Sequence, residues 1–506
     1  MPSRLFDVLY LTACSVLFFG LFHKAASPAP FGYDESDYMM CVRLGIAGNY
    51  LDTNAMSLPQ FVNAGLKLAR KESTRTEVSE YVRGRRDSMF LRHYHGPLNS
   101  YWLIAASALG GSGEARMRLA SLAFHWLTFL TVYAGILWVF GPRFRIAAVA
   151  ASACYLFCVN NITTVAAVSS HAPFLWLSIV TLFTISKLAA APSRKRFYWA
   201  AALCAVSLCA LEFAVLLFLV LAITVAFVRK EFFAQWTRRD YLRFARNTVL
   251  LIAGVCLVLW PSSILKLTIV QGFAFIVFMS ATRRESFGGD VAPLDGWRLL
   301  LRQIPADMLT VSVCVAAGAF LLWRSPRRAQ LLPFFVYALL LTMAIFRNTS
   351  EGARYISSLF APLYVTAAVL LVERAKRIPT VLQAGAVAAL FGVLLFVSHR
   401  EVQARVARSS SVDDRAASLI GFMRGRPSAK VLVPFECLPS LQYYFPDASI
   451  RSYSPDATRA RILAAADSYE AVCLYETGNS APDAAPSVWR AGLVTPKGRL
   501  TCYLRP

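Results

Sequence analysis

Apolar segments long enough to cross a membrane recur along the whole chain. A bilayer core of about 30 Å takes roughly 20 apolar residues of helix. The sequence predicts eleven such spans, at residues 5–22, 119–139, 146–165, 174–188, 199–210, 213–228, 249–260, 308–323, 331–346, 359–372 and 381–397. With 57% apolar and 16% charged residues, the chain is too apolar for an ordinary soluble enzyme. The predicted fold class is an α-helical polytopic membrane protein.

Basic residues gather in the connectors between these spans and account for much of the net charge of +23. The clusters lie at residues 141–145, 193–196, 229–246, 323–328 and 373–377. Positively charged loops stay on the cytoplasmic side of a membrane. Eleven spans that start from a cytoplasmic N-terminus put every cluster on that side. The charge therefore indicates contact with membrane lipids and not with nucleic acid.

Three parts of the chain are predicted to lie outside the spans. Residues 23–113 are far longer than a connecting loop and are interpreted as a folded external loop, in which 98–110 forms a helix at the membrane interface. Residues 266–290 are interpreted as a re-entrant or interfacial stretch on the same side. From residue 399 the charge rises, and the β-type runs 430–435 and 471–476 alternate with helical patterns. The expected domains are a transmembrane module over 1–398 and an extracytoplasmic α/β domain over 399–506.

Three cysteines, Cys437, Cys473 and Cys502, fall in this last domain. An extracytoplasmic compartment is oxidising, so one disulfide among the three is expected. Spacing does not decide which two pair.

The segment YDESDY, residues 33–38, places Asp34, Glu35 and Asp37 just beyond the first span. Inverting transfer of a sugar needs a carboxylate that accepts the proton of the acceptor hydroxyl while the leaving phosphate is neutralised from the other side. Asp34 is predicted to be that base. The alternative is that these acids only cap the helix that follows, because side-chain oxygens near an N-terminus satisfy its N–H groups.

FGYDESDYMM is followed by HYHGPLNSYWLIAASALGG and then by SGEARMRLASLAFHWLTFLTVYAGILWVFG. This succession resembles the protein O-mannosyltransferase and aminoarabinose-transferase group of the GT-C glycosyltransferases. The resemblance implies a GT-C fold with a soluble domain on the outer face, and a polyprenyl-phosphate-linked sugar as donor. The matching positions are Asp34, Glu35, His95, Pro97, Leu98, Tyr101, Trp102, Arg118 and Leu119.

The resemblance also implies roles for particular residues. Asp34 and Glu35 would be catalytic, and Asp37, His93, His95 and Arg118 would line the substrate cavity. The sequence EGARYISSLFAPLY resembles an element that places Arg354 and Tyr355 near the donor phosphate. The chain departs from the family at SSHAPF, where His171 stands at or near the position of a second acid, which makes a metal held by paired acids less expected.

Basic residues on the outer side suit a lipid phosphate, because preorganised cations stabilise the charge of a leaving group. The candidates are Arg354, Lys266, Arg283 and Arg284. For Arg283 and Arg284, binding of anionic headgroups is an equal alternative. His93 and His95 are a weak metal signal without a third ligand, so neither metal nor other cofactor is predicted. Glu212 lies at the edge of a predicted span, where a carboxylate is costly to place in lipid. Two alternatives stay open: Glu212 lines the cavity, or it lies in a turn at the surface.

The predicted function is transfer of a sugar from a polyprenyl-phosphate carrier to a lipid, glycan or protein acceptor. The predicted location is the bacterial inner membrane, with the active site on the periplasmic face. The alternative from another class is a transporter or lipid-linked glycan flippase, which predicts charges or broken helices at the middle of the membrane. A non-catalytic assembly factor and an oligosaccharide ligase that uses a diphosphate carrier also stay open. The sequence identifies neither the sugar nor the acceptor.

Overall fold

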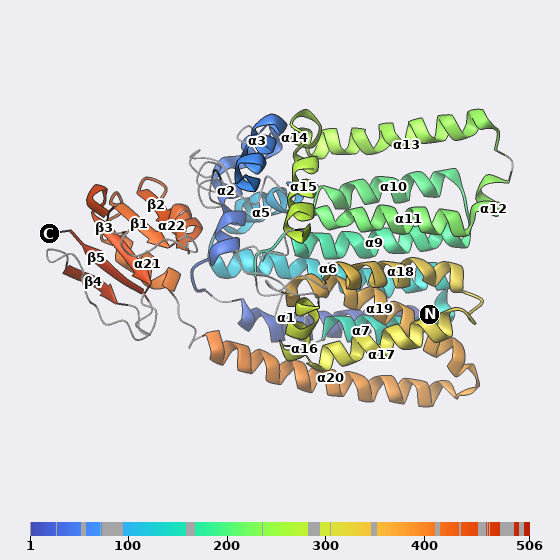
Figure 1. Cartoon of the computed structure of the whole chain (residues 1–506). Coiled ribbons are helices and arrows are strands. Elements are labelled where there is room, and N and C mark those ends of the chain that lie inside the picture. Colours follow the sequence, from blue (N-terminus) through green and yellow to red (C-terminus); the bar gives the residue numbers. More distant parts are fainter. Residues whose placement is uncertain are drawn as a thin grey trace.

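A bundle of long helices makes up most of the chain, and a small domain with a β-sheet lies beyond one end of it (Figure 1). The structure is a computed structural model. It describes residues 2–26, 28–51, 57–70, 72, 95–157, 167–234, 236–281, 294–303, 305–345, 352–409, 415–434, 437–453, 462, 464, 466–475, 490–494 and 500–505.

The predicted spans coincide with helices of the bundle. These are α1 (Pro2–Phe22), α6 (Glu114–Phe140), α7 (Arg145–Leu156), α9 (His171–Ala190), α10 (Arg194–Leu208), α11 (Val215–Phe227), α13 (Arg238–Leu259), α17 (Pro305–Leu322), α18 (Arg328–Ile345), α19 (Gly352–Arg374) and α20 (Thr380–Ser409). Within the described ranges, six helices are long and apolar enough to cross a membrane: α1, α6, α9, α13, α19 and α20. Shorter apolar helices are α11, α17 and α18. The fold is that of a helical polytopic membrane protein, and the number of crossings stays a prediction.

The core of the bundle is built around α9, which packs against α6, α10, α11 and α18. The contact between α6 and α9 is close because Gly135 faces Phe183. A Cβ at Gly135 would lie 2.5 Å from the Phe183 ring. Small residues allow such approaches between helices in a membrane, where packing replaces the hydrophobic effect as the driving force.

One end of the bundle carries the N-terminus and the basic connectors (Figure 1). Three ion pairs among the described residues tie these segments together: Arg145 Nε lies 2.7 Å from Asp7 Oδ1, Arg194 Nη2 lies 3.2 Å from Asp240 Oδ1, and Arg327 Nε lies 3.8 Å from Glu373 Oε1. The short helix α12 (Arg229–Phe233) belongs to this end, which we call the basic end.

The opposite end carries the helices of the predicted external loop and the segment after α13 (Figure 1). The first group is α2 (Tyr33–Leu51), α3 (Leu58–Ala69) and α5 (Leu98–Gly110). The second is α14 (Pro261–Leu265), α15 (Thr268–Ala281) and α16 (Asp295–Gln303). The predicted interfacial helix at 98–110 is α5, and α15 falls within the predicted stretch 266–290. We call this the acid end.

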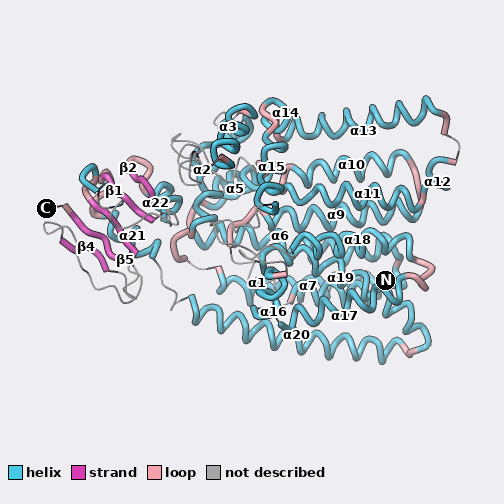
Figure 2. Tube along the Cα trace, viewed as in Figure 1, coloured by secondary structure: helices cyan, strands magenta, loops and turns pink. Residues whose placement is uncertain are grey.

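The C-terminal domain contains all the strands that the structure describes (Figure 2). They are β1 (Lys430–Pro434), β2 (Ser449–Tyr453), β3 (Ala471–Tyr475), β4 (Arg490–Val494) and β5 (Leu500–Leu504), in the order β2-β1-β3-β5-β4. β1 is parallel to β2 and β3, and β5 is antiparallel to β3 and β4. The helices are α21 (Arg415–Arg424) and α22 (Leu438–Tyr444). The predicted β runs form β1 and β3, whereas the predicted boundary at 398 falls inside α20.

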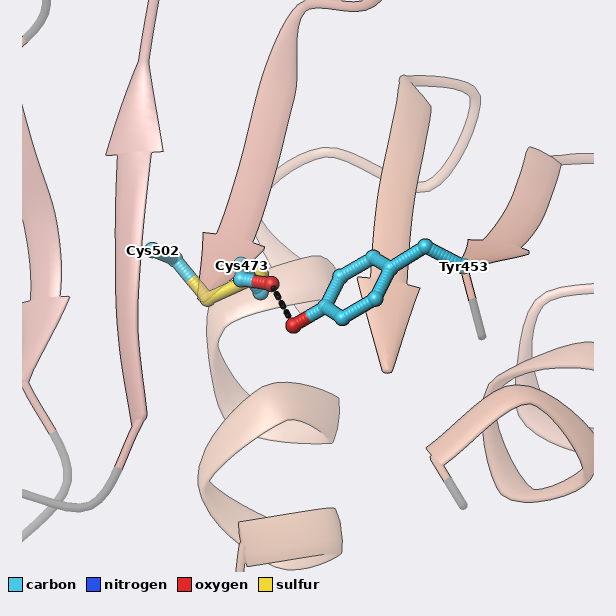
Figure 3. The surroundings of a disulfide bond; sticks show 3 residues. All are labelled: Tyr453, Cys473 and Cys502. Atoms are coloured by element: carbon cyan, nitrogen blue, oxygen red, sulfur yellow. Dashed lines mark hydrogen bonds between the residues drawn. A yellow bond between two sulfur atoms is a disulfide. The ribbon is translucent and has the colours of Figure 1, made fainter. Parts of the chain in front are cut away.

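A disulfide joins β3 to β5 through Cys473 and Cys502, which are paired across the two strands (Figure 3). The Tyr453 hydroxyl donates a hydrogen bond of 2.8 Å to the Cys473 carbonyl oxygen beside it. This pairing answers the question that the cysteine spacing left open. Cys437 lies buried at the start of α22 and is not part of the disulfide.

Candidate active site

The acid motif, residues 33–38, begins α2. The Ser36 N–H donates to the Gly32 carbonyl oxygen at 2.9 Å, and the Gly32 N–H donates to Glu35 Oε2 at 3.2 Å. An acid three residues into a helix that accepts from the entry N–H forms one half of a capping box, since Gly32 has no side chain to make the reciprocal bond. The capping interpretation of the motif therefore holds for Glu35.

Glu35 is also paired with Arg118 of α6. Arg118 Nε lies 2.9 Å from Glu35 Oε1, and Arg118 Nη2 lies 2.5 Å from Glu35 Oε2, so the contact is bidentate. The Val168 N–H donates to the same Oε1 at 2.9 Å. Arg118 is 5% exposed, and it also donates to the carbonyl oxygens of Ala29 and Pro30. Glu35 thus fixes the start of α2 against α6 and the segment before α9.

Asp34 and Asp37 differ from Glu35 in where they project. Consecutive helical residues are about 100° apart around the axis. Since Glu35 is turned to Arg118, Asp34 leaves α2 from a different side. Asp34 is half-buried and Asp37 is 4% exposed. Both carboxylates therefore belong to the acid end, and Asp34 is the more accessible of the two.

His95 brings the HGPL segment to the acid motif. Its ring lies 6.3 Å from the Tyr38 ring, centroid to centroid, at 30°. Its Nδ1 is 2.7 Å from Glu212 Oε2, and Glu212 is 5% exposed. The Tyr38 hydroxyl lies 3.0 Å from Ser170 Oγ. Segments more than a hundred residues apart thus meet here, and the burial of Glu212 argues against a position in a surface turn.

Gly96 allows the segment that carries His95 to pack closely against the turn before Glu212. The Leu98 N–H donates to the Cys209 carbonyl oxygen at 3.0 Å, which draws the start of α5 onto the turn after α10. A Cβ at Gly96 would lie 2.0 Å from that oxygen. A side chain at this position would push apart the two segments that carry His95 and Glu212.

The other predicted site residues that the structure describes lie at the same end. His171 is the first residue of α9, next to Ser170, and is 6% exposed. Lys266 is half-buried between α14 and α15, and α14 contacts α2. Arg354 and Tyr355 lie in the first turn of α19. His93, Arg283 and Arg284 fall outside the described residues.

Sequence reasoning did not single out Ser170 or Asn99. Ser170 carries no motif of its own and is found only through its bond to Tyr38. Asn99 is 2% exposed, and neither atom of its amide has a hydrogen-bond partner among the described residues. A buried unpaired amide is costly. In the sequence, the signal that could have drawn attention to Asn99 was its position directly after the HGPL segment.

Within the ranges given above, no group of three or more His, Cys, Asp and Glu side chains is placed to hold an ion.

The architecture defines the class of the protein: it is a helical polytopic membrane protein with the GT-C fold. This confirms the predicted fold. No protein-family model and no curated protein matches the chain.

The particular likeness is to ArnT, an aminoarabinose transferase. The crystal structure of ArnT from Cupriavidus metallidurans bound to undecaprenyl phosphate matches with a TM-score of 0.63 at 13% identity, over 98% of this chain and 97% of ArnT. The apo structure of the same protein gives a TM-score of 0.60 at 12% identity, over 99% and 98% of the two chains. The likeness spans the C-terminal domain as well as the bundle.

Proposed function

We propose that the chain is an integral-membrane glycosyltransferase that moves a sugar from a polyprenyl-phosphate carrier to a lipid, glycan or protein acceptor. The observation that carries the proposal is the fixed acid motif at one end of a GT-C bundle. The full-length likeness to ArnT, which binds undecaprenyl phosphate in its crystal structure, supports the carrier.

Asp34 is the proposed base. It accepts the proton of the acceptor hydroxyl as the acceptor oxygen bonds to the anomeric carbon from the side opposite the phosphate. The bond between that carbon and the phosphate oxygen breaks, and its electron pair leaves with the polyprenyl phosphate. The sugar is transferred with inversion of configuration. The ion pair of Glu35 with Arg118 supports the choice of Asp34 as the base, because a carboxylate held by a guanidinium is suited to positioning the start of α2.

The leaving phosphate needs positive charge on its own side of the sugar. Lys266 and Arg354 are the proposed partners, with Tyr355 beside them, because such preorganised donors act where negative charge develops. Asp37, His93, His95, Arg118 and His171 are proposed to line the substrate cavity. Binding and orientation of the sugar hydroxyls is the expected task of the polar groups around His95.

The acid end is proposed to face the outer compartment. The basic connectors lie together at the other end, and positively charged segments remain in the cytoplasm. The disulfide between Cys473 and Cys502 lies in the domain beyond the acid end, and disulfides persist in oxidising compartments. These two independent features support the same orientation.

The test is Asp34→Asn, assayed in proteoliposomes with undecaprenyl-phosphate-linked mannose and aminoarabinose as donors and a membrane extract as acceptor. Loss of the base is expected to lower kcat by about 10²- to 10⁴-fold without changing the KM for the donor. Glu231→Gln is the matched control, since Glu231 is exposed on α12 at the basic end. Full activity of the correctly inserted Asp34→Asn protein would exclude Asp34 as the base. Failure of the wild-type protein to use any polyprenyl-phosphate sugar would exclude the proposed function.

A further inference from the structure

The segment that leads into the acid motif is held by two different parts of the molecule. From the bundle, Arg118 donates to the carbonyl oxygens of Ala29 and Pro30. The next residue, Phe31, is fully buried and is bonded by the C-terminal domain. Its N–H donates to the Tyr444 hydroxyl oxygen at 2.9 Å, and its carbonyl oxygen accepts from Ser440 Oγ at 3.1 Å. Both backbone groups of Phe31 are thus bonded to α22.

The contact reaches the acid motif itself. Ser36 Oγ donates to the same Phe31 carbonyl oxygen at 3.1 Å and lies 3.4 Å from Ser440 Oγ. Phe31 is separated from Asp34 by two residues. A shift of Phe31 would therefore move the start of α2, because Ser36 ties the first helical turn to the same carbonyl oxygen.

Tyr444 connects α22 to the bundle as well. Its hydroxyl donates to Glu114 Oε1 at 2.6 Å, at the beginning of α6. Burial, and next the hydrogen bond to the Glu114 carboxylate, raise the pKa of Tyr444 above its ordinary value. At neutral pH the Tyr444 hydroxyl is therefore protonated, so it donates to Glu114 and accepts from the Phe31 N–H.

Apolar contacts surround these polar bonds. Tyr443 packs edge-on against the Phe31 ring, with 5.5 Å between centroids, and the Arg43 guanidinium lies 5.0 Å from the Tyr443 ring centre. Tyr443 also joins a buried cluster with residues of α2, α5 and α6. The junction of α22 with α2 is thus a packed interface that excludes water from the bonds to Phe31.

We infer that the C-terminal domain is a positioning element for the transfer reaction: Tyr444 and Ser440 fix Phe31, and through it the direction in which Asp34 projects. This inference rests on the proposed function. Tyr444 touches neither the sugar nor the reacting atoms in this scheme. Its effect is on geometry, and a small misplacement of a catalytic group lowers the rate steeply.

The experiment compares Tyr444→Phe with Tyr453→Phe in the full-length protein in proteoliposomes. Both changes remove one tyrosine hydroxyl from the C-terminal domain, but Tyr453 bonds within the domain, to Cys473 (Figure 3). Hydrogen exchange of residues 29–38 is measured by mass spectrometry, together with kcat and KM for the two donors named above. Tyr444→Phe is expected to accelerate exchange in residues 29–38 about tenfold. It is also expected to lower kcat by about 10- to 100-fold at unchanged donor KM. Tyr453→Phe should do neither.

Equal exchange and equal kcat in the two variants would overturn the inference, and so would faster exchange at an unchanged kcat. If Tyr444→Phe does not accumulate, Ser440→Ala decides by the same two measurements, with changes in the same direction. Asp34→Asn separates the two proposals. If that variant keeps full activity, the proposed function has failed in its choice of base, while the exchange of residues 29–38 still reports whether α22 holds Phe31.

Discussion

Neighbouring acids in the acid motif have different environments. Glu35 accepts from a guanidinium and from two backbone N–H groups, while Asp34 projects from another side of α2. The sequence could place both carboxylates after the first predicted span, but it could not show that their environments differ. That difference depends on Arg118, which is 83 residues further along the chain.

Arg118→Ala is expected to lower the free energy of unfolding by about 3–5 kcal/mol, because it leaves the Glu35 carboxylate poorly exposed and without its ionic partner. Thermal unfolding in detergent measures the effect. Arg116→Ala is the control on the same helix. Arg116 is exposed, so its loss should change stability by less than about 0.5 kcal/mol. Similar unfolding temperatures for the two variants would contradict a structural role for the Glu35–Arg118 pair.

At the scale of elements, hydropathy predicted the helices well and their contacts hardly at all. The spans followed from apolar length alone, and α5 followed from a shorter apolar run. The pairing of His95 with Glu212 joins positions 117 residues apart and leaves no pattern in the sequence. A carboxylate at the edge of a span was recognisable as unusual, but its partner was not.

The close approach of α5 to the turn after α10 depends on Gly96. Gly96→Ala is expected to cost about 3 kcal/mol or to prevent accumulation of the protein, because its Cβ would overlap the Cys209 carbonyl oxygen. Gly110→Ala, at the other end of α5, meets nothing within 4 Å and should be neutral or stabilising by up to about 1 kcal/mol. Expression level and unfolding temperature measure both. Equal behaviour would show that the approach of α5 to the turn after α10 is not tight.

The whole molecule has two chemically different ends, and here the sequence was most informative. Clusters of Arg and Lys separated by apolar spans predicted that the basic connectors share one side, and they lie together with the N-terminus in the structure (Figure 1). The junction between α22 and α2 was not predictable, because it joins polar residues of two separately folded parts whose spacing in sequence is arbitrary.

Labelling with a membrane-impermeant thiol reagent tests the orientation. In intact spheroplasts, a cysteine introduced at Asp447, exposed in the C-terminal domain, is expected to react. A cysteine introduced at Lys230, exposed on α12, is expected to react only after permeabilisation. The unmodified protein supplies the background from native thiols. The reverse pattern would invert the topology and remove the acid motif from the outer face.

The strand order of the C-terminal domain has a consequence for biosynthesis. β5 follows β4 in the chain, yet it lies between β3 and β4 in the sheet, so among the described strands β4 has no neighbour until β5 has been synthesised. Leu500 and Cys502 of β5 share their apolar core with Leu438 and Leu441 of α22. The core that α22 shares with the sheet, and with it the junction between α22 and α2, is therefore expected to form only after β5 has been synthesised.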